Sequence, residues 1–237
     1  MAKIDKTQYT KEEFQKLKEQ RRATKLSVVS EIEKVESMPM IQSNTAFILG
    51  NGTSRATVKS QELKPFGKVY GCNALYRTFD PDYLIAVDVK MVLEINKAGY
   101  QHKHTVWTNP NKSYQKMSNL NFFQPSKGWS SGPTALWLAS QHSYSTIYIL
   151  GFDYQGTDSG KHFNNMYADT VNYKKSTDGA TFFGNWLRQT VSVIKENPNI
   201  MFYRVIIPDN YIPDELNKFV NMKHITTDTF KKMYSLS

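Results

Sequence analysis

The chain has 237 residues, 40% hydrophobic and 22% charged, which suits one sizeable α/β domain with its own core. Cys72 is the only cysteine, which excludes internal disulfides and zinc ribbons, and no apolar run approaches the ~20 residues of a membrane span. The net charge of +9 favours a polyanionic partner such as DNA, RNA or a charged nucleotide, although many basic proteins bind no nucleic acid. Without a signal-peptide core in its polar N-terminus, the protein is expected to be cytoplasmic.

Residues 1–40 differ in composition from the rest and predict an N-terminal helical extension. Thr10–Glu13 reads as a capping box, and a polar, charge-rich helix is expected from Lys11 to Ser37. Its apolar stripe is only partial. The helix either packs on the side of the domain or serves as an oligomerisation arm or nucleic-acid contact.

From residue 41 to residue 237, strand and helix patterns alternate. The predicted strands are Ala46–Leu49, Lys68–Tyr70, Tyr83–Val87, Thr105–Trp107, Thr146–Leu150 and Phe202–Ile207. The predicted helices are Lys90–Ala98, Thr134–His142, Phe183–Glu196, Asp214–Asn221 and Thr227–Tyr234. Alternation of this kind predicts an α/β, Rossmann-like domain with a mostly parallel sheet and helices on both faces. Ligands of such sheets bind beyond the carboxyl ends of the strands.

The first strand stops at Gly50–Ser54, which reads Gly-Asn-Gly-Thr-Ser. Its two glycines are expected to adopt backbone angles that a side chain would forbid and to let a ligand come close. Thr53 or Ser54 is expected to cap the helix that follows. Strand, glycine turn and helix N-terminus together predict an anion site, typical of nucleotide phosphate. The motif matches neither G-x-G-x-x-G nor the P-loop, so an ordinary strand-to-helix turn is the alternative.

Small, amide-bearing and acidic residues follow five successive predicted strands. They are Gly50-Asn51-Gly52, Gly71-Cys72-Asn73, Asp88, Thr108-Asn109 and Gly151-Phe152-Asp153. Together they predict a site that hydrogen-bonds a polyhydroxy or heterocyclic ligand. Asn51 and Asn73 can each donate and accept, although either could simply be a left-handed turn residue.

A second helix N-terminus is predicted at Ser130-Ser131-Gly132, ahead of an apolar helix. Serine and glycine at this position also suit an anion. The helix leads directly into the strand that ends at Gly151-Phe152-Asp153. This order of motifs is more specific than any of its parts.

The ordered motifs resemble those of bacterial sialyltransferases that use CMP-sialic acid, and of their glycosyltransferase-like relatives in bacteria and phages. The matching positions are Gly50, Asn51, Gly52, Ser54, Cys72, Asn73, Tyr76, Ser131, Gly132, Ile147, Tyr148, Gly151, Asp153 and Tyr154. The resemblance implies a metal-independent transferase that takes a nucleotide sugar as donor substrate and needs no cofactor. It implies that Asn51, Asn73 and Ser131 contact the nucleotide sugar, and that Gly151–Tyr154 line its base or ribose.

Glycosyl transfer needs a base near the acceptor hydroxyl, and the candidates are Asp88, Asp153 and His162. Asp88 could instead be a helix N-cap, and His162 a surface histidine in a loop that suits a closing lid. Asp80-Pro81-Asp82 is interpreted as a turn and His102-x-His104 as a solvated pair, so we expect no metal site.

The acceptor is less constrained by the sequence. Aromatic residues interleave with lysines between residues 112 and 174, namely Tyr114, Phe122, Phe123, Trp129, Phe163, Tyr167 and Tyr173. Such residues can stack on exposed bases while lysines hold phosphates, which makes a hydroxylated base in phage DNA one candidate acceptor. The alternative is that they belong to the core or form sugar platforms. A non-catalytic nucleotide- or nucleic-acid-binding protein on the same fold is the competing function.

Overall fold

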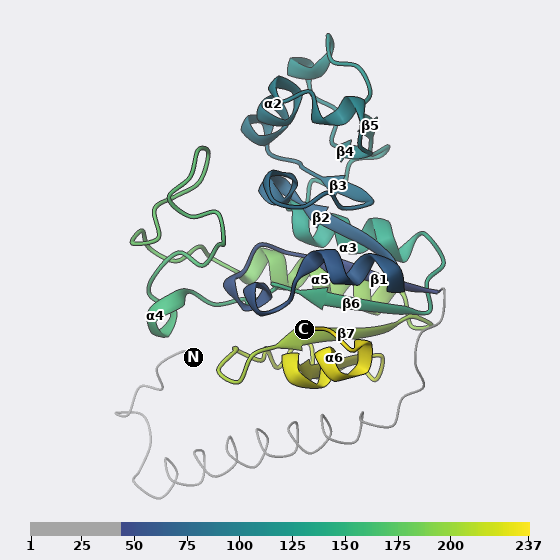
Figure 1. Cartoon of the computed structure of the whole chain (residues 1–237), viewed down its shortest axis with the longest axis vertical. Coiled ribbons are helices and arrows are strands. Elements are labelled where there is room, and N and C mark those ends of the chain that lie inside the picture. The colour runs from purple at the N-terminus through teal and green to yellow at the C-terminus, as the bar shows by residue number, and fades with distance from the viewer. Residues whose placement is uncertain (1–43) are drawn as a thin grey trace, which may run out of the picture.

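The computed structural model describes residues 44–237 (Figure 1). The predicted helix Lys11–Ser37 and its capping box therefore lie outside the described residues. The described part folds around one sheet of β1 (Thr45–Leu49), β2 (Lys68–Cys72), β3 (Tyr83–Ile85), β4 (Val106–Thr108), β5 (Asn121–Phe122), β6 (Thr146–Leu150), β7 (Met201–Ile206) and β8 (Met222–Thr226). All neighbouring strands pair in parallel, in the order β5-β4-β3-β2-β1-β6-β7-β8. The predicted Rossmann-like α/β fold is confirmed.

The strand order reverses direction between β1 and β6. The chain builds outward from β1 to β5 and then returns to the other side of β1, where β6 pairs along its whole length. The connections leaving these two strands diverge, so a crevice opens between their carboxyl ends. The fold thus places the Gly50–Ser54 loop and the Gly151–Tyr154 loop side by side.

Helices cover both faces of the sheet, and alternate residues of β1 show how. Phe47 and Leu49 pack on the face covered by α2 (Val89–Lys97) and α6 (Thr227–Tyr234). Ala46 and Ile48 pack on the opposite face with α3 (Ser131–Ser140) and α5 (Gly184–Glu196). Because both faces are buried, a continuous apolar run rather than an alternating one encodes this central strand.

Short elements fill the connections. The 3₁₀ helices are η3 (Thr53–Thr57), η4 (Ser60–Phe66), η5 (Asn73–Arg77), η6 (Tyr100–His102) and η7 (Lys112–Tyr114). The segment between β6 and α5 carries the single-turn α4 (Thr157–Gly160) and extends beyond the carboxyl ends of the strands (Figure 1). Within residues 44–237, no helix is long and apolar enough to cross a bilayer.

Two predictions about the C-terminal third are corrected. The expected helix Asp214–Asn221 is a series of turns, because only Leu216 of its apolar residues is fully buried while Val220 is 88% exposed. A helix there would have no apolar face to bury. The next residues form β8, an edge strand not predicted from the sequence because Lys223 and His224 interrupt its apolar pattern.

Candidate active site

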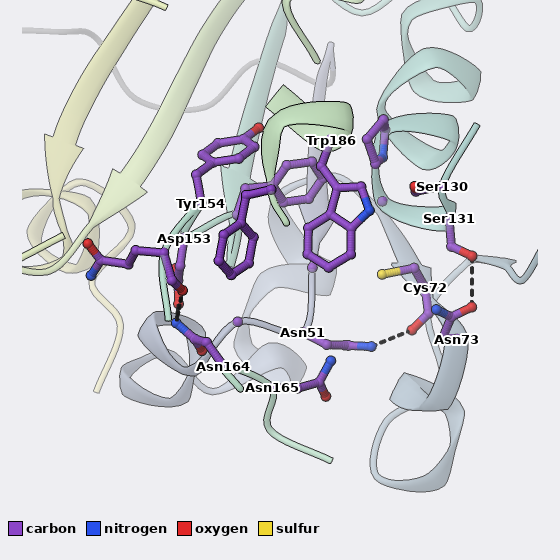
Figure 2. A pocket seen from close by; sticks show the side chains of 18 of the residues that line it. Asn51, Cys72, Asn73, Ser130, Ser131, Asp153, Tyr154, Asn164, Asn165 and Trp186 are labelled. Carbon is purple, nitrogen blue, oxygen red and sulfur yellow. Dashed lines mark hydrogen bonds between the residues drawn. The ribbon is translucent and has the colours of Figure 1, made fainter. Parts of the chain in front are cut away.

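The loops that follow β1 and β6 contact each other backbone to backbone. Gly50 donates its N–H to the carbonyl of Leu150 at 2.8 Å, and Gly52 donates to the carbonyl of Gly151 at 3.0 Å. A cavity of about 190 Å³ lies beside these loops, bounded by the start of α3, by Asn164 and Asn165, and by the start of α5 (Figure 2). Most predicted site residues line it, namely Gly50, Asn51, Gly52, Asn73, Asp88, Ser131, Gly132, Gly151, Asp153 and Tyr154. Ser54 and His162 do not.

The glycines of the first loop are required for a different reason than expected. Neither Gly50 nor Gly52 is left-handed, and Gly52 has φ −65° and ψ 148°. A Cβ on Gly50 would lie 2.5 Å from the Gly151 carbonyl oxygen, and one on Gly52 would lie 2.5 Å from a carboxylate oxygen of Asp153. The glycines therefore permit the two loops to touch, and the left-handed glycine is Gly151, at φ 70°.

The predicted anion site at this loop is filled by the protein's own side chains. The N–H of Thr53 donates to Asn164 Oδ1 at 2.9 Å, and the N–H of Ser54 donates to Asp153 Oδ2 at 3.1 Å. The Ser54 hydroxyl also donates to Asp153, and Asn164 Nδ2 donates to it at 3.0 Å. The expected capping by Thr53 or Ser54 is wrong, because the N-cap of η3 is Gly52 and no side chain caps it. Asp153 takes the place that a phosphate was expected to occupy.

The N-terminus of α3 lies open to the cavity. Its N-cap is Ser130, which makes no side-chain cap, and its first turn contains no acidic residue. Ser130, Ser131 and Gly132 all line the cavity. Free N–H groups at the start of a helix favour an anion. The start of α3 can therefore bind an anion, whereas the start of η3 is already occupied by Asp153 and Asn164.

A chain of hydrogen bonds connects α3 to Asp88. The N–H of Val87 donates to Ser131 Oγ at 3.1 Å, and the Ser131 hydroxyl donates to Asn73 Oδ1 at 2.7 Å (Figure 2). Asn73 Nδ2 then lies 3.4 Å from Asp88 Oδ2. Asn73 is also left-handed, with φ 52°, so the turn interpretation is confirmed for it, while its contact with a ligand stays a prediction.

Asp88 occupies the N-cap position of α2, yet its side chain caps no helical N–H. The residue is exposed, so its carboxylate is accessible to a substrate. It lines the main cavity and also a neighbouring hollow of about 390 Å³, formed with Lys90, Asn172 and Tyr173. Asn73 and Asp88 are the two residues that the cavity and the hollow share.

Asn51 lines the cavity, and its side-chain amide and its backbone are both engaged by neighbouring segments. Its Nδ2 donates to the carbonyl of Cys72 at 3.0 Å, whereas its buried Oδ1 has no hydrogen-bond partner (Figure 2). The Asn51 carbonyl accepts from the N–H of Met166 at 2.8 Å, which ties the β6–α5 segment to the loop. The buried Oδ1 is out of contact with solvent, so a ligand reaches it only if neighbouring atoms move.

Sequence reasoning expected Gly151–Tyr154 at the site but missed the other half of the aromatic wall, Phe183 and Trp186. The rings of Phe152, Tyr154, Phe183 and Trp186 line the cavity, and Trp186 and Asn51 extend toward the same space (Figure 2). Tyr154 is left-handed at φ 52° and donates its hydroxyl to Thr190 Oγ1 at 2.7 Å. Burial raises its pKa to about 12, so it remains a neutral phenol. Phe183 is the N-cap residue of the amphipathic helix α5 and Trp186 lies in its first turn, and nothing in the pattern of this segment separates site aromatics from core aromatics.

The likeness to known proteins is confined to solved structures. No family model and no curated protein matches the chain. The similar solved structures are sialyltransferases. Sialyltransferase CstII from Campylobacter jejuni, in complex with a substrate analogue, cytidine-5'-monophosphate, has 15% identity, a TM-score of 0.48, and coverage of 76% of this chain and 85% of its own. An α-2,3-sialyltransferase from Campylobacter jejuni in apo form has 13% identity, a TM-score of 0.44, and coverage of 78% and 85%.

The remaining predicted catalytic residues lie away from the cavity or are already engaged. His162 Nδ1 lies 3.6 Å from Asp158 Oδ2, and no histidine lines the cavity in the part of the chain that is described. Asp80-Pro81-Asp82 precedes β3, at the opposite ends of the strands, where Asp82 accepts from Lys68 and from the N–H of Val69. Among residues 44–237, no three His, Cys, Asp or Glu side chains group closely enough to hold a metal ion.

Most of the aromatic residues considered for nucleic-acid stacking are unsuited to it. Tyr114, Phe123, Phe163 and Tyr167 are all buried, with at most 8% of each residue exposed. They pack within the protein and offer no free ring face to a base. The core interpretation of these four residues is therefore confirmed.

Proposed function

We propose that the protein is a nucleotide-sugar-dependent glycosyltransferase in which Asp88 is the catalytic base. The observation that carries the proposal is the exposed carboxylate of Asp88 at the junction of the cavity and the neighbouring hollow. A donor in the cavity and an acceptor in the hollow would meet at this carboxylate. The metal-independent, cofactor-free transfer implied by the sequence motifs is part of the proposal.

The lining of the cavity suits one orientation of the donor. The aromatic wall of Phe152, Phe183 and Trp186 suits the flat face of a base, because stacking on aromatic side chains is favourable for every base. The open start of α3 suits an anionic group of the donor. Asn51 borders the same space and is proposed to contact the donor.

The reaction follows from this placement. Asp88 takes the proton from the acceptor hydroxyl as its oxygen bonds to the anomeric carbon of the donor sugar. The bond from that carbon to the phosphate oxygen breaks, and the nucleotide leaves with the electron pair. N–H groups at the start of α3 stabilise the anion without reorganising. Asp153 is assigned a positioning role here rather than that of a base, since Ser54 and Asn164 occupy its oxygens.

A panel of nucleotides provides the first test. One of CMP, UDP, GDP and NAD should raise the unfolding temperature selectively, because a ligand at about 100 times its Kd adds about 2.7 kcal/mol of stability. Asn51→Ala should weaken that response, while Asn185→Ala, an exposed residue of α5 outside the cavity, should not. Silence to all four nucleotides, together with tight DNA binding, would establish the competing non-catalytic function.

The acceptor requires its own experiment. We propose transfer to a hydroxylated base in DNA. No Lys or Arg lines the cavity, so the basic residues behind the net charge of +9 lie elsewhere and are available to a polyanionic acceptor. Incubation with each nucleotide sugar and either hydroxymethylated DNA or a glycan, followed by mass spectrometry, identifies the acceptor. Turnover of a donor with glycans alone would remove DNA as the acceptor.

A further inference from the structure

Two buried arginines lie behind a cavity whose own lining contains no cation. Arg204 of β7 is 1% exposed and Arg55 of η3 is 4% exposed. Each donates hydrogen bonds to one of the two loops that follow β1 and β6. Guanidinium groups rarely lose contact with water to this extent without a carboxylate partner.

Arg204 supports the loop that follows β6. Its Nε donates to the Phe152 carbonyl at 2.8 Å, and its Nη2 donates to the Asp153 carbonyl at 3.2 Å. Its Nη1 donates to the Tyr211 carbonyl at 2.9 Å. The guanidinium carbon lies 5.2 Å from the ring centroid of Tyr154, which itself lines the cavity. A single aromatic ring therefore separates this charge from the ligand space.

Arg55 supports the loop that follows β1 in the same manner. Its Nε donates to the Gly50 carbonyl at 2.7 Å, and its Nη1 donates to Ser60 Oγ at 3.1 Å. Its Nη2 is buried without a hydrogen-bond partner. Both loops thus have a guanidinium on the side away from the cavity.

Backbone carbonyls accept hydrogen bonds from Arg204 and Arg55 but do not neutralise the positive charge of the two guanidinium groups. Within residues 44–237, neither arginine forms an ion pair, in contrast to Arg77, whose Nη2 lies 2.6 Å from Glu94 Oε2. The buried carboxylate nearby is Asp153, one negative charge against two positive ones. A buried excess of positive charge is costly unless an anion approaches it.

We infer that Arg204 and Arg55 are positioning residues whose unpaired charge selects a phosphate-bearing ligand over its neutral nucleoside. The inference rests on the proposed function and deepens it. When the bond from the anomeric carbon to the phosphate oxygen breaks, the electron pair stays on the phosphate and its negative charge grows by one. Fixed positive charge behind the loops stabilises that leaving group without occupying the cavity.

His224 allows the charge to be tested without touching a loop. It stands opposite Arg204 in the register of β7 and β8, is 6% exposed, and has no hydrogen-bond partner on either ring nitrogen. His224→Glu would place a carboxylate beside Arg204 and pair its charge. His224→Gln is the matched neutral control.

The measurement is the affinity for a nucleoside monophosphate and for the corresponding nucleoside, by calorimetry. The wild type should prefer the monophosphate by at least about tenfold. His224→Glu should remove most of that preference while nucleoside affinity changes by less than about twofold, and His224→Gln should keep the preference. Equal losses for both ligands in His224→Glu would overturn the inference, because they would indicate a purely structural effect.

A second pair of variants covers a failure of His224→Glu to fold. Arg204→Lys keeps the charge and should retain the preference for the monophosphate, whereas Arg204→Met should lose it; Arg77→Met is the control at a paired arginine. If the wild type binds monophosphate and nucleoside equally, the inference fails while the proposed function stands. If the wild type binds no nucleotide at all, the proposed function itself fails.

Discussion

Asn73 Nδ2 lies 3.4 Å from Asp88 Oδ2, and this contact joins the carboxyl end of β2 to that of β3. The other side of the same amide accepts from Ser131, whose oxygen accepts from the N–H of Val87. Each donor in this chain has one acceptor, which fixes the orientation of the Asn73 amide. The direction of the Asp88 carboxylate therefore depends on contacts from three separate elements.

Replacing Asn73 separates its backbone role from its side-chain role. Asn73→Gly tolerates the left-handed φ of 52° but loses the amide, and the stranded Ser131 hydroxyl should cost about 1–3 kcal/mol of unfolding free energy. Asn73→Ala should cost about 1–2 kcal/mol more, because alanine is strained in this conformation. Urea unfolding of both variants checks the difference. Equal stabilities would show that backbone strain plays no part.

Asp88→Asn should abolish turnover while leaving the donor site intact. Loss of a positioned base lowers the rate by about 10²–10⁴-fold, and nucleotide affinity should change little because the amide has nearly the same shape. Steady-state kinetics and thermal shift measure the two properties separately. Asp214→Asn, an exposed residue outside the cavity, is the control. Wild-type turnover in Asp88→Asn would remove Asp88 from the mechanism.

Gly50→Ala should destabilise the fold and disrupt the site together. The new Cβ would lie 2.5 Å from the Gly151 carbonyl oxygen, so one loop has to move, at a cost of about 1–3 kcal/mol. Gly179→Ala meets no atom within 4 Å and should be harmless. Thermal unfolding compares the pair. A Gly50→Ala protein as stable as Gly179→Ala would mean that the two loops are not in fixed contact.

His224 should make stability depend on pH below neutrality. Burial, and then the nearby charge of Arg204, lower its pKa from 6.5 to about 3. Between these values the unfolded chain binds a proton that the folded protein does not. Stability should therefore fall as the pH drops through this window, by about 1.4 kcal/mol per pH unit, and be fully present above pH 6.5. In His224→Gln, this one-proton contribution to the slope should disappear from urea unfolding between pH 6.5 and 4.

The parts of the fold that the sequence predicted well are those with strong local signals. β1 and β6 are apolar runs bounded by small residues, and α6 was predicted at its observed bounds, Thr227–Tyr234. Edge strand β8 was missed because burial of His224 depends on neighbours distant in sequence. Short-range patterns carry no record of such neighbours.

The candidate site likewise has parts that local sequence signals predict and parts that depend on residues distant in the sequence. The switch-point rule brought Asn51, Asn73 and Ser131 to one cavity, because it depends only on strand order and strand ends. The occupancy of the η3 start by Asp153 could not be foreseen, since a carboxylate and a bound phosphate satisfy the same N–H groups. Trp186 escaped notice because it approaches the cavity from a helix on the far side of the β6–α5 segment.

The contact of Thr53 with Asn164 spans 111 positions of the chain, and it has a consequence for biosynthesis. Three lining residues precede β2 and nine follow β6, so a nascent chain lacks part of the cavity until Trp186 has left the ribosome. Capture of the proposed nucleotide-sugar donor by ribosome-bound chains should therefore begin only once the cavity is complete. Contacts between residues so far apart in the sequence form slowly, and binding of the proposed donor should stabilise the completed fold.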